Sequence, residues 1–242
     1  MAEILLEVCV DSAAGLMAAL EGGADRIELC SALELGGLTP SFGLMKFAAR
    51  QPLPVYAMIR PRAGDFVFDA NELAIMRDDI AMARESGLAG VVLGVSRSDG
   101  RVDAEMLGYL VEHSYGLGLT LHRAFDCAGP NFSFALETAI SLGFERILTS
   151  GGELSATEGL AVLEQLFEQS AGRISIMPGA GIHAANARLL KARLPLREVH
   201  GSCSKPMPSA HGLAANLGFA HDGQRETDAA LVRALKVALE SD

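Results

Sequence analysis

The sequence repeats one unit eight times, and this repetition constrains the fold more than any other feature. Each unit has a short run rich in β-branched and apolar residues, a glycine or polar turn, and a longer amphipathic segment. The predicted strands span residues 4–10, 24–30, 55–61, 90–95, 118–125, 146–151, 174–179 and 198–203. The predicted helices span residues 12–21, 40–50, 71–86, 103–113, 130–142, 156–169, 183–191 and 227–240.

Eight such units in 242 residues average about 30 residues each, which is the size of one strand–helix repeat. Eight repeats close naturally into a barrel of parallel strands surrounded by helices. An open doubly wound sheet is the alternative, but no strand is followed by the G-x-G-x-x-G turn of a dinucleotide site. The sequence therefore predicts an α/β protein, with residues 1–242 forming one (β/α)₈ TIM barrel.

Local signals mark several helix ends. Thr39 precedes Pro40, a pairing that predicts an N-cap followed by proline at the first helical position. Gly22, Gly87 and Gly143 follow three predicted helices, where a left-handed residue is favoured.

Composition excludes several classes of function. The formal net charge is −10, and no basic stripe is interleaved with aromatic residues, so we expect no nucleic-acid partner. The N-terminal segment has no basic region, and the apolar runs are far too short to span a membrane. We therefore expect a soluble cytoplasmic protein in which the four cysteines are free thiols or metal ligands.

Polar residues gather where the predicted strands end, which is the active-site face of a (β/α)₈ barrel. Because side chains alternate along a strand, one parity turns several of them into the barrel. These inward residues are Glu7, Cys9, Glu28, Cys30, Arg60, Thr120, His122, His200 and Ser202. Burial of ionised groups is costly unless they are paired, so this set predicts either a ligand site or a neutralising network without a ligand.

The loops at the same rim add candidates for anion binding. Arg60 and Arg62 suit the bidentate recognition of carboxylate or phosphate. The complete set of anion-binding candidates is Arg60, Arg62, Thr149, Ser150, Gly151, Gly179, Gly181 and Ser202. The glycines among them are also ordinary turn residues, and that alternative stays open. Residues 205–224 form the longest predicted loop, which is either a lid over this rim or disordered.

Two thiols form a second constellation. Glu7 and Cys9 repeat the E-x-C pattern of Glu28 and Cys30 at the ends of adjacent strands. Two inward thiols at matching heights would share a soft metal ion such as Cu(I). The alternative is that each cysteine is a small apolar filler.

The phrases LLEVCVDS, GADRIELCS, GGLTPS, MIRPRAGDF, LHRAFD, FERILTSG, IMPGAGI and EVHGS together resemble the CutC family of copper homeostasis proteins. The resemblance runs in order from about Leu5 to Ser202 and implies a cytoplasmic TIM barrel associated with copper. It further implies that Cys9 and Cys30 are the Cu(I) ligands. The family's polar rim residues match Glu7, Glu28, Arg60, His122, Asp126 and His200.

Two hypotheses of function follow. The first is a protein that binds Cu(I) through Cys9 and Cys30, with Glu7 and Glu28 nearby. The second is an enzyme for a small anionic compound, such as a phosphorylated sugar. Its candidate acid/base residues are Glu7, Glu28, His122, Asp126 and His200. A barrel that serves only as an interaction scaffold is a third interpretation, and a homo-oligomer is compatible with all three.

Overall fold

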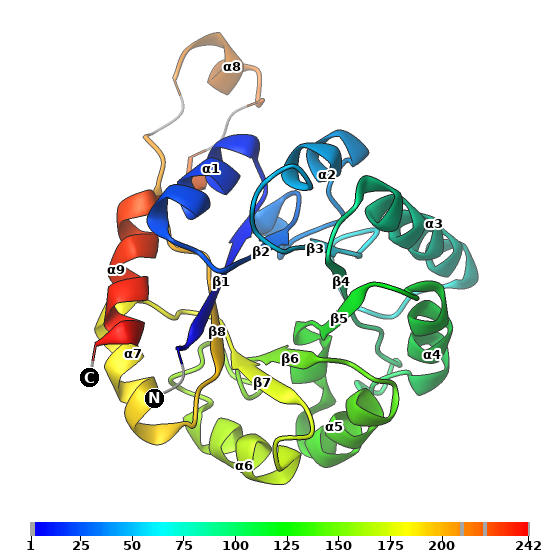
Figure 1. Ribbon diagram of the computed structural model, residues 1–242. Coiled ribbons are helices and arrows are strands. Elements are labelled where there is room, and N and C mark those ends of the chain that lie inside the picture. The colour runs from blue at the N-terminus through cyan, green and yellow to red at the C-terminus, as the bar shows by residue number, and fades with distance from the viewer. Residues whose placement is uncertain (1–2, 209–210, 220–221, 242) are drawn as a thin grey trace.

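The computed structural model describes residues 3–208, 211–219 and 222–241, and its parallel strands form a ring enclosed by helices (Figure 1). The strands are β1 (Leu5–Val10), β2 (Arg26–Leu29), β3 (Val55–Met58), β4 (Gly90–Leu93), β5 (Gly118–Leu121), β6 (Arg146–Thr149), β7 (Ser175–Pro178) and β8 (Glu198–Gly201). They form one sheet in the order β7-β6-β5-β4-β3-β2-β1-β8, and β7 also lies beside β8. The predicted (β/α)₈ barrel is confirmed.

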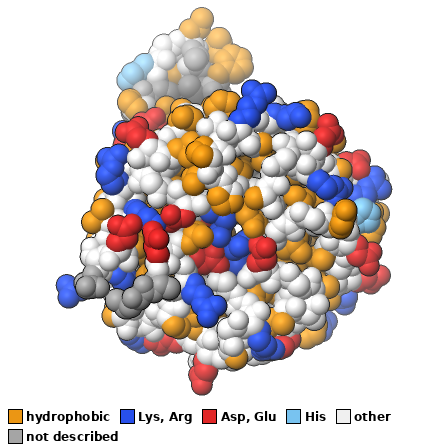
Figure 2. Space-filling view, viewed as in Figure 1, with side chains coloured by type: hydrophobic (Ala, Val, Ile, Leu, Met, Phe, Trp, Pro, Cys, Tyr) orange, Lys and Arg blue, Asp and Glu red, His pale blue; other side chains and the backbone are white. Residues whose placement is uncertain are grey.

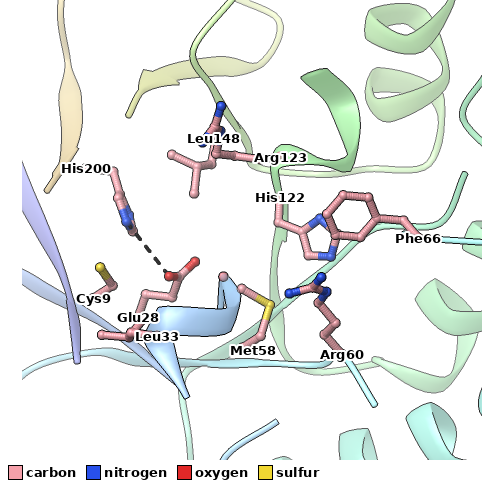
Figure 3. Close-up of a pocket in the computed structure, with 11 residues that line it drawn as sticks. Cys9, Glu28, Leu33, Met58, Arg60, Phe66, His122, Arg123, Leu148 and His200 are labelled. Carbon is pink, nitrogen blue, oxygen red and sulfur yellow. Dashed lines mark ion pairs between the residues drawn. The ribbon is translucent and has the colours of Figure 1, made fainter. Parts of the chain in front are cut away.

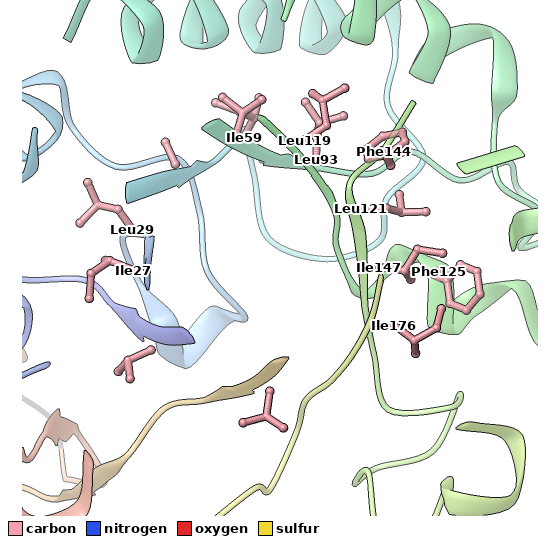
Figure 4. Close-up of a cluster of buried hydrophobic side chains, with 14 of the residues drawn as sticks. Ile27, Leu29, Ile59, Leu93, Leu119, Leu121, Phe125, Phe144, Ile147 and Ile176 are labelled. Carbon is pink, nitrogen blue, oxygen red and sulfur yellow. The ribbon is translucent and has the colours of Figure 1, made fainter. Parts of the chain in front are cut away.

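The outer ring consists of amphipathic helices that pack on the outside of the strands. These helices are α1 (Ala13–Gly22), α2 (Phe42–Ala48), α3 (Ala70–Ser86), α4 (Ala104–His113), α5 (Phe132–Ser141), α6 (Leu160–Ser170), α7 (Ala184–Arg193) and α9 (Ala229–Glu240). Outward strand residues such as Ile27, Leu29 and Ile147 form the core beneath the helices (Figure 4). The opposite parity leaves polar side chains inside the barrel. None of the helices in the described ranges is both long and apolar enough to span a bilayer.

Two helix-end predictions are wrong. Thr39 does not cap α2, because its Oγ1 accepts a hydrogen bond from the Arg60 N–H, and Ser41 caps the helix through Leu44 N–H instead. Gly22 remains helical, and the left-handed residue is Gly23, with φ of 91°. Gly22 has a different role, because a Cβ there would lie 2.4 Å from Val232 Cβ of α9. Gly87 and Gly143 do take left-handed conformations, with φ of 85° and 80°.

The fifth and eighth strands end earlier than predicted. β5 stops at Leu121, because His122 Nδ1 accepts the Ala124 N–H and caps the 3₁₀ segment η2 (Arg123–Asn131). This turn carries Arg123 and Asp126 along the rim of the barrel. β8 stops at Gly201, so Ser202 is exposed rather than directed into the barrel.

The predicted long loop contains structure of its own. β9 (Ser204–Pro206) pairs antiparallel with β10 (Arg225–Thr227), and the short helix α8 (Gly212–Asn216) lies between them in sequence. Figure 1 shows α8 beyond α1, away from the centre of the ring, so this described part is not a lid over the barrel. Residues 209–210 and 220–221 of the same loop lie outside the described residues.

Candidate functional site

A cavity of about 190 Å³ lies inside the barrel at the carboxyl ends of the strands (Figure 3). Cys9, Glu28, Arg60, His122 and His200 line it, which brings together five of the residues that the sequence predicted. The other lining residues are Leu33, Gly36, Met58, Phe66, Arg123 and Leu148. Figure 3 shows Glu28 and His200 on one side of the cavity, with Arg60 and His122 on the other.

An ion-pair network lies beneath this cavity, and sequence reasoning missed most of it. Arg26 is buried between Glu7 and Glu198 and pairs with both. Arg146 Nε lies 3.2 Å from Glu198 Oε2. Two guanidinium groups therefore compensate the buried carboxylates. Arg26 precedes Glu28 by two residues, so the strand parity that placed Glu28 inside also applied to Arg26.

The network connects to the cavity through Glu7 and His200. His200 Nδ1 lies 2.8 Å from Glu7 Oε1. Burial alone would raise the pKa of Glu7, but the charge of Arg26 and the bond to His200 outweigh it and lower that pKa to about 2. Glu7 is therefore an ionised carboxylate that fixes the orientation of the imidazole ring.

The side chains of His200 and Glu28 lie next to each other, and their charges interact. His200 Nε2 lies 3.8 Å from Glu28 Oε2, as the dashed line in Figure 3 marks. Burial opposes a charge on His200, but Glu28, the Cys9 sulfur and the bond to Glu7 together raise the pKa of His200 well above its ordinary value. Burial also raises the pKa of Glu28, with the charge of Glu7 adding to the effect.

Cys9, Glu28 and His200 form a group with the chemistry of a metal site. One donor atom from each lies within 4.8 Å of the other two. Within the described part of the chain, Glu28 Oε1 is buried and has no hydrogen-bond partner. With Nδ1 held by Glu7, Nε2 of His200 faces the group, which is the carboxylate–histidine–metal arrangement common around bound metals. These three residues therefore fit a metal ion.

Cys30 lies outside this three-residue group. β1 and β2 pair with Cys9 opposite Glu28, so Cys30 is not level with Cys9, and its role as a second Cu(I) ligand stays a prediction. Strands in a barrel are staggered, so equal positions in a repeated pattern are offset along neighbouring strands. Cys30 Sγ lies 3.6 Å from Glu28 Oε2 and has no exposed surface. Burial and the neighbouring Glu28 raise the pKa of Cys30 well above its ordinary value.

The opposite side of the cavity carries one cation and one neutral imidazole. Arg60 donates to the backbone carbonyls of Leu35, Gly37 and Gly64 at 3.0, 3.1 and 2.7 Å. His122 Nδ1 accepts the Ala124 N–H, so the ring proton of the neutral form is on Nε2. Burial and the charge of Arg60 lower the pKa of His122 to about 3.

The rings and charges on this side are packed together. The His122 ring lies 4.8 Å from the Phe66 ring, and the Arg60 guanidinium lies 4.9 Å from the same ring. Arg60 Nε and His122 Nε2 are both buried and have no hydrogen-bond partner among the residues that the structure describes. Two residues that line the cavity therefore carry an unpaired N–H donor.

Asp126 joins the loop that follows β6 to η2, and it lies outside the cavity lining. Its carboxylate accepts from the Thr149 hydroxyl at 2.5 Å, from Ser150 N–H at 3.1 Å and from Gly152 N–H at 3.2 Å. Arg123 Nε lies 2.7 Å from the same carboxylate. The sequence assigned Thr149 and Ser150 to the binding of an external anion. Their hydroxyl and N–H groups instead bind the carboxylate of Asp126. The roles assigned to Asp126, Thr149, Ser150 and Gly151 stay predictions.

The remaining anion-binding candidates are dispersed. Arg62 is bound to Glu72 and Asp65 and does not line the cavity. Gly181 and Ser202 line a separate hollow near α7 and α9. Gly179 leaves room for the Leu148 side chain, because a Cβ there would lie 2.4 Å from Leu148 Cδ1. Thr120 receives a hydrogen bond from Arg146 in the network below.

Surface charges are mixed on the face that Figure 2 shows. Acidic and basic side chains meet at the centre of the ring, and around it both signs are interspersed. This face therefore presents no basic stripe of the kind that binds a phosphate backbone.

Comparisons with known proteins give one consistent result. The model of the CutC family matches residues 4–205. A CutC family protein of Sinorhizobium medicae is 58% identical over 241 residues, covering 100% of this chain and 98% of that protein. Its counterpart from Agrobacterium fabrum is 54% identical, covering 98% of this chain and 94% of that protein. The crystal structure of the putative copper homeostasis protein CutC from Streptococcus agalactiae has 33% identity and a TM-score of 0.79, covering 82% of this chain and 98% of that chain.

Proposed function

Because the chain belongs to the CutC family, we propose that it acts in copper homeostasis by binding Cu(I) inside the barrel. The structural relative from Streptococcus agalactiae is described as a putative copper homeostasis protein, which supports this assignment. The observation that carries the proposal is the group formed by Cys9, Glu28 and His200, whose donor atoms lie within 4.8 Å of one another. We also propose a cytoplasmic location, which the four free cysteines support.

The donor types determine the role of each residue. Cu(I) favours thiolate and imidazole ligands over carboxylate oxygens, so Cys9 and His200 are the proposed ligands. Glu28 lies beside them with one unpaired oxygen and supplies negative charge. Glu7 holds His200 Nδ1 and leaves Nε2 for the metal. The second thiolate predicted from the sequence, Cys30, is tested separately below.

Metal and proton compete for the same atom. The carboxylates around His200 favour its protonated form, in which Nε2 carries a proton. A metal ion on Nε2 must displace that proton, and the thiol of Cys9 must also lose its proton to become a ligand. We therefore expect the affinity for Cu(I) to fall as the pH is lowered.

An anaerobic Cu(I) titration against a competing chromogenic chelator tests this proposal. The wild-type protein should bind one Cu(I), and Cys9→Ser should lose this stoichiometric binding. Cys127→Ser is the matched control, because Cys127 is an exposed thiol outside the cavity. If Cys30→Ser removes binding as fully as Cys9→Ser, the two-cysteine site holds instead. Unchanged binding in Cys9→Ser would reject both arrangements.

An enzyme for a small anionic compound is the second candidate. The observation that favours it is the content of the cavity, because a metal carrier needs neither a buried arginine nor a neutral histidine there. Glu28 and His200 would exchange the proton, and Arg60 would bind the anion. Native mass spectrometry of freshly purified protein separates the two candidates. Bound copper favours the first, and a bound metabolite without copper favours the second.

A further inference from the structure

Three of the residues that line the cavity carry a buried polar atom without a partner among the described residues. In the described ranges, five buried side-chain polar atoms have no hydrogen-bond partner, and three of them belong to cavity-lining residues. These three are Glu28 Oε1, Arg60 Nε and His122 Nε2. A buried polar atom without a partner is costly, so three of them around one hollow indicate a ligand that completes their bonds.

Arg60 also carries a charge without a counter-charge. Its guanidinium is buried, and its recorded hydrogen bonds go to neutral carbonyl oxygens. Across the part of the chain that the structure describes, no carboxylate forms an ion pair with Arg60. A buried cation of this kind is stabilised by an anion, and the cavity is the open side from which an anion can reach it.

We infer that the side of the cavity formed by Arg60 and His122 binds the carboxylate of a small organic acid, and that Glu28 across the cavity binds a hydroxyl group of the same molecule. This inference rests on the second candidate function and not on copper binding, because Arg60 and His122 lie outside the proposed metal group and only Glu28 is shared with it.

The charge and the donor count favour a carboxylate over a phosphate. Arg60 Nε–H and His122 Nε2–H are two donors with a single positive charge between them, because His122 is neutral. This matches the two oxygens and single charge of a carboxylate. The groups that would help to bind a phosphate dianion, Arg62 and the Gly181 loop, lie elsewhere.

The rest of the lining indicates the carbon chain and the other end of the ligand. The cavity of about 190 Å³ has room for a small organic molecule. Leu33, Met58 and Leu148 provide the apolar walls for that chain. Glu28 Oε1 has a free lone pair on the far side, and a hydroxyl group is its natural donor.

Isothermal titration of the metal-free full-length protein tests the inference. The probes are butyrate, 3-hydroxybutyrate, 4-hydroxybutyrate and inorganic phosphate. We expect at least one hydroxy acid to bind more than tenfold tighter than butyrate, and phosphate to bind more weakly than either hydroxy acid. Tighter binding of phosphate, or no binding of any acid, would overturn the inference.

Arg60→Lys tests whether Arg60 binds the carboxylate end of the ligand. Arg60→Lys keeps the charge but removes the Nε–H, and we expect at least a tenfold loss of affinity for every acid. Arg62→Lys is the matched control and should bind like the wild type, because Arg62 does not line the cavity. Equal losses in both variants would refute the assignment.

Glu28→Gln tests the hydroxyl end without touching Arg60. It should reduce the preference for the hydroxy acid over butyrate. An unchanged preference would show that Glu28 does not contact the hydroxyl group. Because copper is absent throughout, failure of the copper proposal leaves these results unaffected, and failure of acid binding leaves the copper titration unaffected.

Discussion

The variant Glu7→Gln tests the buried network most sharply, because glutamine has the shape of a protonated glutamate. In the native protein, Arg26 and His200 lower the pKa of Glu7 from 4.5 to about 2. Each pH unit of such a shift corresponds to about 1.4 kcal/mol, so the ionised carboxylate contributes about 3 kcal/mol to stability at neutral pH. Loss of one partner from a buried ion pair costs a similar amount, about 3–5 kcal/mol.

The pH dependence follows from the sign of the shift. A lowered folded-state pKa stabilises the protein above pH 4.5, and that contribution is lost as the pH falls from 4.5 towards 2. Glu7→Gln should therefore lower the free energy of unfolding by about 3 kcal/mol at pH 7. The difference from the wild type should shrink steadily below pH 4.5, where Glu7 itself becomes neutral.

Urea unfolding monitored by circular dichroism at several pH values measures this difference. Glu164→Gln is the matched control, since Glu164 pairs with Arg193 on the surface and should cost less than about 1 kcal/mol. A Glu7→Gln variant within about 1 kcal/mol of the wild type at pH 7 would refute the reasoning. A difference that does not change with pH would refute it as well.

Three further predictions concern packing, a loop and a histidine. Gly22→Ala should destabilise the protein by about 1–3 kcal/mol in urea unfolding, because its Cβ meets Val232, whereas Gly43→Ala in open space should stabilise it by up to about 1 kcal/mol. Asp126→Ala leaves the Ser150 N–H unpaired, so hydrogen exchange at residues 149–152 should become faster, and unchanged exchange would contradict the anchoring role. Burial and Arg60 lower the pKa of His122 to about 3. Between pH 6.5 and 3, the unfolded chain therefore takes up a proton that the folded chain does not. The free energy of unfolding falls as the pH is lowered through this range. His122→Asn should make that fall shallower in acid unfolding curves.

The fold was predictable because the repeat unit is local. Periodicity and turn residues lie within about 30 residues of each other, and eight such units leave few alternatives to a barrel. Helix ends were less predictable because distant partners compete for the capping groups. The Thr39 hydroxyl accepts a hydrogen bond from the Arg60 N–H instead of capping a helix. Gly22 stays helical where α9 packs closely against it.

The sequence was enough to predict which residues lie in the site, but not which of them lie opposite one another. Strand parity alone brought Glu28, Arg60 and His200 into the barrel, and the cavity contains all three. The register between β1 and β2 depends on the stagger of the closed barrel, which no local pattern encodes, so Cys30 was placed level with Cys9. Arg26 carried the same parity signal as Glu28 and could have been found from it.

X-ray absorption spectroscopy of the Cu(I)-loaded protein tests the central claim most directly, since it reports which atoms bind the metal. Copper held by Cys9 and His200 should show a mixed shell of sulfur and nitrogen, and the nitrogen contribution should disappear in His200→Gln. A shell of sulfur alone, unaltered by that substitution, would contradict the account.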